Sequence, residues 1–365
     1  MKLFGLILAK SAEAKRKNIL PQAQDCSERK SRDNLAKADK PHRILDVFIK
    51  ALISLAVVLS TTYGWRPARS FVPSSSGPEE ETAHNLERTV AYLAGVIGDR
   101  NYLAYENLQN AAAYLTESFR ALGYQTDDLS YTIQGREFKN VVAQFPGAPV
   151  SNSVIVIGAH YDTCFNPGAD DNASGVAALL ELARLLKDAS LKKQIKFIAF
   201  VNEEPPFFTT EEMGSRIYAR IAKKMGEQID AAVILEMLGF YSERRFSQKY
   251  LPLLGPFYPN RANFIAVVGD FPSRRLVAKA VVGFRKGSVF PIESLVAPAW
   301  VPGIYFSDHW SFWQEGYSAV MVTDTAYLRS PHYHASTDLP ETLDYRRMAA
   351  VVHGLKGSII HLANQ

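Results

Sequence analysis

Histidine and acidic residues occur in five short clusters between residues 160 and 334, and these residue types can bind a metal ion or move a proton. The clusters are His160 with Asp162, Asp170 with Asp171, Glu203 with Glu204, Glu236 alone, and His332 with His334. Taken singly, each has an ordinary structural explanation, such as a helix cap or a solvated surface pair. Only their convergence would indicate chemistry, so the elements that carry them decide the interpretation.

Four of the clusters follow short apolar runs that predict buried strands. The predicted strands are Val154–Gly158, Ile195–Val201, Ala231–Leu235 and Ser318–Thr323, with another at Phe264–Val268. Helical spacing of apolar residues recurs between and after them, at Gly175–Leu186, Arg216–Lys224, Leu276–Phe284 and Thr342–Leu362. Such alternation is typical of a largely parallel sheet covered on both faces. Because functional side chains gather at the carboxyl ends of such strands, we expect the clusters to meet at one edge.

The part of the chain before these strands is expected to add two helices over residues 82–122 and a pair of strands over residues 129–146. The simplest account is a single three-layer α/β/α domain over residues 82–365 with a mixed, mostly parallel sheet. At 365 residues, 47% of them hydrophobic, the chain is long enough to bury a large core.

The charge and cysteine content exclude several classes of protein. The net charge of +4 comes from a basic excess in the first fifty residues, and the remainder is slightly acidic, so nucleic-acid binding is not expected. The two cysteines, Cys26 and Cys164, exclude a disulfide framework and a zinc finger. Histidine and carboxylate side chains must therefore hold any metal.

A hydrophobic stretch at residues 47–65 follows a basic tail at residues 1–46 and precedes a flexible linker at residues 66–81. About 20 apolar residues span a bilayer, and preceding basic residues favour an inside amino terminus. We expect a transmembrane anchor, with the following domain exported to the periplasmic or extracellular side. The alternatives are a cleaved signal peptide, which would give a secreted protein, and a buried core helix.

The motifs GAHYDT, GADDNASG, NEEPP, LEMLG and PHYH followed by TD occur in this order. Over about residues 82–365 the sequence resembles metallopeptidase family 28, the leucyl-aminopeptidase-like zinc exopeptidases that are related to glutamate carboxypeptidases and glutaminyl cyclases. The resemblance implies a catalytic domain with two zinc ions per chain. The implied ligands are Asp171 bridging both ions, His160 and Glu236 on one ion, and Glu204 and His334 on the other.

The resemblance also implies roles for residues beside the ligands. Glu203 matches the general base, Asp162 matches the acid that orients His160, and a cis peptide bond is expected between Asp171 and Asn172. Neighbouring residues of an extended segment point to opposite sides, so we expect Glu204 to bind metal while Glu203 faces the water.

The environment of the site is predicted less sharply. Tyr333 is a candidate oxyanion donor, with a packed aromatic ring as the alternative, and Cys164 is expected to act as a small hydrophobic residue. Residues 244–301, rich in Phe, Tyr and Pro, are expected to shape the pocket wall. We expect structural hydrogen bonds from Asp308 and His309.

Together these features predict a metal-dependent aminopeptidase that hydrolyses the N-terminal bond of a peptide substrate. Retention of Glu203, Glu204 and Glu236 favours hydrolysis over the alternatives. Those are a glutaminyl-cyclase-like transferase with a single zinc, a carboxypeptidase of the same family, and a binding module with an inactive site. The sequence leaves open the side-chain preference, the oligomeric state and whether the metal is zinc, cobalt or manganese.

Overall fold

The computed structural model describes residues 71–74, 76–147, 150–251 and 254–365. The hydrophobic stretch at residues 47–65 and the basic tail before it lie outside these residues. Among the helices that are described, none has both the length and the hydropathy needed to cross a membrane.

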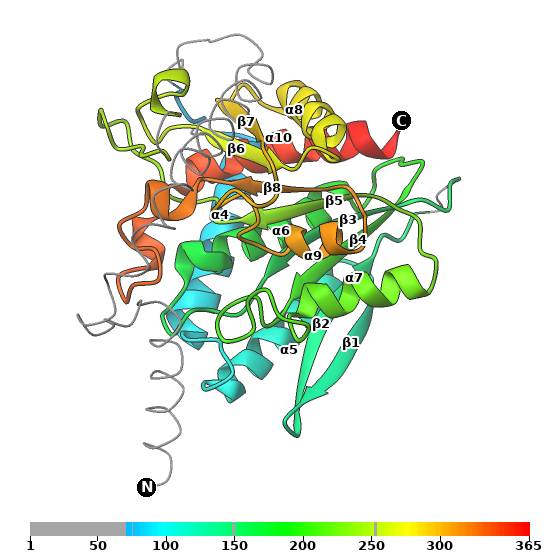
Figure 1. The fold of residues 1–365 in the computed structure, drawn as a ribbon. Coiled ribbons are helices and arrows are strands. Elements are labelled where there is room, and N and C mark those ends of the chain that lie inside the picture. The colour runs from blue at the N-terminus through cyan, green and yellow to red at the C-terminus, as the bar shows by residue number, and fades with distance from the viewer. Residues whose placement is uncertain (1–70, 75, 148–149, 252–253) are drawn as a thin grey trace, which may run out of the picture. The chain divides into compact units, whose positions relative to one another are not determined.

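Eight strands form one mixed sheet in the order β1-β2-β4-β3-β5-β8-β6-β7 (Figure 1). The strands are β1 (Gln125–Ile133), β2 (Arg136–Gln144), β3 (Val154–His160), β4 (Gln194–Phe200), β5 (Ile229–Glu236), β6 (Ile265–Gly269), β7 (Ile292–Val296) and β8 (Ala319–Thr323). The central strands β4, β3, β5 and β8 are parallel, so all four end at the same edge. Strand β2 pairs antiparallel with β4, and β6 pairs antiparallel with β8, so β6 and β7 begin at that edge. The predicted fold class is confirmed.

Helices cover both faces of the sheet (Figure 1). One face packs against α4 (Pro78–Val90), α5 (Tyr105–Ala121), α6 (Gly175–Leu186), α8 (Arg274–Gly287) and α10 (Tyr345–Ala363). The other face packs against α7 (Gly214–Lys224) and α9 (His309–Gln314). Short helical segments join these elements: η1 (Ala91–Ile97), η2 (Ala169–Ser174), η3 (Gly255–Phe257), η4 (Ala326–Leu328) and η5 (Pro340–Thr342). Helices thus leave the β8-β6-β7 part of the second face to loops.

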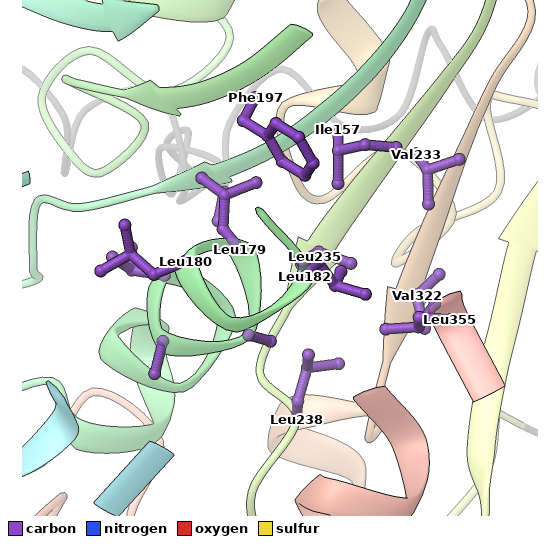
Figure 2. Close-up of a cluster of buried hydrophobic side chains, with 14 of the residues drawn as sticks. Ile157, Leu179, Leu180, Leu182, Phe197, Val233, Leu235, Leu238, Val322 and Leu355 are labelled. Carbon is purple, nitrogen blue, oxygen red and sulfur yellow. The ribbon is translucent and has the colours of Figure 1, made fainter. Parts of the chain in front are cut away.

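The main core lies between the sheet and α6 (Figure 2), where Ile157, Phe197 and Val233 face Leu179 and Leu182. Strand β3 is buried on both faces, which explains why its sequence is continuously apolar rather than alternating.

The opposite face of β3 is packed just as closely, at the strand end that carries His160. A Cβ atom on Gly158 would lie 2.4 Å from the ring of Phe200 and 3.0 Å from Ile234. Only glycine fits here without moving the aromatic ring.

Three elements differ from the sequence predictions. Strand β7 was not predicted, because it is an edge strand in which Glu293 and Ser294 interrupt the apolar pattern. Helix α9 has six residues, too few to show helical periodicity. Helix α4 begins at Pro78, inside the predicted linker 66–81. Proline at the first helical position, followed by three glutamates in the first turn, is a favourable helix start.

Candidate metal centre

The five predicted ligands come from five different segments and meet at the edge where the parallel strands end. His160 and Glu236 are the last residues of β3 and β5. Glu204 follows β4, His334 lies in the loop after β8, and Asp171 lies in η2 immediately before α6. The structure thus brings together side chains that are widely separated in the sequence.

Asp171 lies between the two histidines, with one carboxylate oxygen directed at each. Its Oδ1 atom is 3.4 Å from Nε2 of His160, and its Oδ2 atom is 3.2 Å from Nε2 of His334. Glu236 Oε2 lies 3.3 Å from the same His160 nitrogen, and Glu204 Oε2 lies 3.5 Å from the same His334 nitrogen. The five side chains therefore form two groups of three that share Asp171.

The donor atoms of these groups suit zinc, which binds histidine nitrogen and carboxylate oxygen. Nε2 of His160 and Oε1 of Glu204 are buried and have no hydrogen-bond partner among the described residues. Buried polar atoms are rarely left without a partner unless an ion or water satisfies them. The residues present therefore fit a pair of metal ions.

The electrostatics of the site also favour a cation. Burial, the main cause, raises the pKa of Glu203 well above its usual value and that of Glu204 to about 7. Burial acts against protonation of His160, but the nearby Glu236 and Glu203 nevertheless raise its pKa well above the ordinary value. A buried surplus of carboxylates such as this is stabilised by positive charge.

Glu203 and Glu204 both face the centre, contrary to the expectation that they point to opposite sides. One oxygen of each carboxylate lies within 4.8 Å of the other and of a His160 ring nitrogen. The alternation rule does not apply because β4 ends at Phe200 and the chain turns at Asn202, which has a φ of 61°.

Asp162 holds this turn in place. Its two carboxylate oxygens accept the backbone N–H groups of Glu203 at 3.1 Å and Glu204 at 3.0 Å. Nδ1 of His160 lies 3.1 Å from the backbone carbonyl oxygen of Asp162, and its carboxylate is slightly farther away, at 3.6 Å. Asp162 thus contacts His160 mainly through its backbone and the two glutamates through its side chain.

The remaining predicted site residues divide into near and distant neighbours. The ring of Tyr333 stacks on that of His334, with centroids 3.8 Å apart and an interplanar angle of 19°. Cys164 is half-buried, and its sulfur lies within 4.8 Å of ligand atoms of Glu204 and His334, so it borders the site instead of packing in an apolar core. His332 pairs with Thr337 at 3.0 Å, outside the cluster.

The segment containing Asp308 and His309 agrees only in part with its expected structural role. His309 is fully buried and its Nε2 lies 2.6 Å from the carbonyl oxygen of Ile304. Neither carboxylate oxygen of Asp308 has a hydrogen-bond partner within the described part of the chain, and burial raises its pKa to about 7.

Three residues that support the site had no assigned role in the sequence interpretation. Asp338 accepts the backbone N–H groups of Asp170 and Asp171 at 2.8 Å and 3.0 Å. Ser307 donates its hydroxyl to Oε2 of Glu236 at 2.7 Å. Asp338 belongs to the TD pair of the last motif, which gave a signal, whereas Ser307 gave none.

Arg100 is the third of these residues, and it is completely buried. Its guanidinium donates to the carbonyl oxygens of Tyr161 and Gly168, and also to those of Leu93, Gly98 and Pro167, at 2.8–3.0 Å. It therefore fixes both ends of the loop between His160 and Asp171.

The backbone around Asp171 is also specific. The bond between Asp171 and Asn172 is cis, as the resemblance implied. The side chain of Asn172 donates to the carbonyl oxygen of Leu235 at 2.8 Å and accepts the N–H of Gly175 at 3.0 Å. A Cβ atom on Gly175 would lie 2.8 Å from that same carbonyl oxygen, so glycine is needed where α6 approaches β5.

Comparison with known proteins gives the family. The sequence profile described as peptidase family M28 matches residues 140–356, more than half of the chain. The chain belongs to peptidase family M28. The uncharacterized protein YfbL of Escherichia coli (strain K12) is 37% identical over 323 residues, covering 86% of this M28 chain and 97% of YfbL.

More distant relatives of this M28 protein have printed activities. Leucine aminopeptidase 1 of Metarhizium robertsii is 28% identical over 240 residues, covering 61% of this chain but only 54% of that protein. Among solved structures, BSAP, a zinc aminopeptidase from Bacillus subtilis, has a TM-score of 0.63 at 16% identity over 78% of this chain and 95% of its own. The glutaminyl cyclase of Bacteroides thetaiotaomicron has a TM-score of 0.57 at 17% identity, covering 76% and 97%. At these identities the likeness shows a common fold.

Proposed function

We propose that this M28 protein is a zinc-dependent aminopeptidase with Glu203 as its general base. The observation that carries the proposal is the position of Asp171, whose two carboxylate oxygens each approach a different histidine. Such a carboxylate suits a pair of ions better than a single one. The aminopeptidases among the relatives of the chain support the choice of reaction.

In this proposal His160, Asp171 and Glu236 hold one zinc ion, and Asp171, Glu204 and His334 hold the other. When bound, the two ions would polarise the substrate carbonyl and lower the pKa of an attacking water. Glu203 lies beside the ligands, with one oxygen 3.9 Å from Nε2 of His160. From there it takes a proton from the water and returns it to the leaving amine.

The surrounding residues position these groups. Asp162 fixes the backbone of Glu203 and Glu204 together, so the base and a ligand keep a constant spacing. Ser307 directs one oxygen of Glu236 through its hydroxyl. Tyr333, stacked on His334, is placed to donate to the carbonyl oxygen as negative charge develops.

A second candidate is glutaminyl cyclase activity, which is favoured by the fold shared with the Bacteroides enzyme. That reaction closes an N-terminal glutamine into pyroglutamate and needs no attacking water. Two groups of ligands around Asp171, with a separate glutamate available as base, support hydrolysis instead.

The test is an assay of the full chain on aminoacyl amides, their N-acetylated forms, glutaminyl peptides and peptides with a free carboxyl terminus. We expect cleavage of free aminoacyl amides, loss of activity with a chelator, and recovery with two equivalents of zinc. Pyroglutamate formation with one equivalent would replace the proposal with the cyclase. Cleavage confined to the carboxyl end would replace it with a carboxypeptidase.

A further inference from the structure

A row of four paired residues crosses the sheet from the candidate metal centre to the edge strand. Glu236 on β5 pairs with Thr323 on β8, Thr323 pairs with Ala266 on β6, and Ala266 pairs with Glu293 on β7. Paired residues of neighbouring strands point to the same face of a sheet. The row therefore has a carboxylate at each end and two small side chains between them.

The four residues of this row line one cavity. Three strand spacings of about 4.8 Å separate Glu236 from Glu293, so the cavity is roughly 14 Å long between their backbones. Its other walls are mainly apolar and aromatic: Tyr250, Tyr258, Phe306, Tyr327, Tyr333 and Leu254. Most come from loops, because α7 and α9 do not cover this part of the sheet. We name this space the side-chain cavity.

Glu293 is an unpaired acid at the far end of the side-chain cavity. It makes no hydrogen bond or ion pair with any described residue, and its burial raises its pKa to about 7, an effect that Arg285 on α8 partly offsets. The nearby tyrosine hydroxyls are committed elsewhere: Tyr250 donates to Pro259 at 2.5 Å, and Tyr258 donates to Ser294 at 3.1 Å. A half-buried carboxylate without a partner is costly unless a ligand supplies one.

We propose that the side-chain cavity holds the side chain of the substrate's N-terminal residue, and that Glu293 selects a basic one, lysine or arginine. This inference rests on the proposed aminopeptidase function and names its substrate class. The scissile bond would lie at Glu236, and the side chain would run over Thr323 and Ala266 towards Glu293. An aliphatic stem with a charged head matches a cavity with apolar walls and an acid at its end.

The dimensions explain why a long side chain is needed. A leucine side chain has only two carbons beyond Cβ along its length, so it would leave the outer half of the cavity and Glu293 unfilled. Lysine and arginine place their charge several bonds farther out. An ion pair in a partly buried, apolar site is stronger than one in water, and the tyrosine rings would add cation–π contacts.

The first test compares kcat/KM for lysine, arginine, norleucine and leucine amides in the wild-type protein and in Glu293→Gln. Norleucine matches the lysine stem but lacks the charge. We expect the wild type to prefer the basic amides over norleucine by about tenfold or more, and the variant to lose that preference while keeping its norleucine rate within about threefold. The exposed Glu211→Gln is the matched control and should change neither rate.

A binding measurement makes the inference independent of turnover. Calorimetry with butylguanidinium should give at least about tenfold weaker binding to Glu293→Gln and to Glu293→Leu than to the wild type. Equal binding to all three proteins would overturn the subsite.

The two tests separate the possible failures. If leucine and norleucine amides are cleaved without any basic preference, the subsite is wrong and the aminopeptidase proposal stands. If no aminoacyl amide is cleaved but butylguanidinium binding depends on Glu293, the cationic subsite stands and the aminopeptidase proposal fails.

Discussion

Asp338 accepts the backbone N–H of Asp171 at 3.0 Å across 167 positions of sequence. Its second oxygen accepts the N–H of Asp170 at 2.8 Å. One carboxylate in the loop before α10 thus sets the backbone that presents the shared carboxylate of the candidate centre. It acts on the centre without being part of either ligand group.

Replacing Asp338 with Asn should therefore weaken metal binding without removing a ligand. The amide has one acceptor oxygen, so one of the two backbone N–H groups loses its partner. We expect about 1–3 kcal/mol less stability and about 10–100-fold weaker zinc binding. Urea unfolding and competition with a chromogenic chelator measure the two effects. Exposed Asp188→Asn is the control, and unchanged zinc affinity in Asp338→Asn would contradict the role.

Replacing Glu203 with Gln should separate metal binding from turnover. The amide keeps the size of the side chain but cannot take a proton, so we expect kcat to fall by about 10²–10⁴-fold. Metal analysis should still find two zinc ions per chain. The exposed Glu212→Gln is the matched control. Near-normal kcat in Glu203→Gln would remove this residue as the base.

Replacing the buried Arg100 with Lys should destabilise the fold although the charge is kept. One ammonium group cannot reproduce the contacts that the planar guanidinium makes with five carbonyl oxygens. We expect a loss of about 3 kcal/mol or more, measured by urea unfolding. The same change at the solvent-facing Arg120 should have little effect. Equal losses at the two positions would show that the buried contacts contribute nothing specific.

The buried ring of His309 predicts a loss of stability in mild acid. Burial lowers its pKa to about 4, so the folded chain keeps the ring neutral where an unfolded histidine, with a pKa near 6.5, gains a proton. The unfolded state then binds more protons, and stability falls between about pH 6.5 and pH 4.

This effect is measured as a difference between two proteins. With chelator present, the wild type should lose about 2 kcal/mol more than His309→Gln between pH 7.5 and pH 5. The comparison cancels the titration of all other groups that the two proteins share. If both proteins lose the same stability over this range, the ring does not titrate as described.

The sequence predicted the parallel strands well because their burial on both faces leaves long apolar runs. Its motifs also named the side chains that meet at the edge of the sheet. It did not predict β7, whose polar residues reflect a cavity and an edge that only the folded sheet defines. For the same reason Ser307 gave no signal: a single hydroxyl gains its meaning from the distant carboxylate of Glu236. Glu203 was named correctly as part of the cluster, but its direction depends on the turn at Asn202.

The distribution of the ligands has a consequence for how the protein matures. His160, Asp171, Glu204 and Glu236 are synthesised well before His334, and His334 reaches them only after β8 has paired with β5. A nascent chain therefore carries a cluster of buried acids whose second histidine has not yet been made. Loading of the second ion becomes a late event, which follows completion of the sheet and adds to its stability once it has occurred.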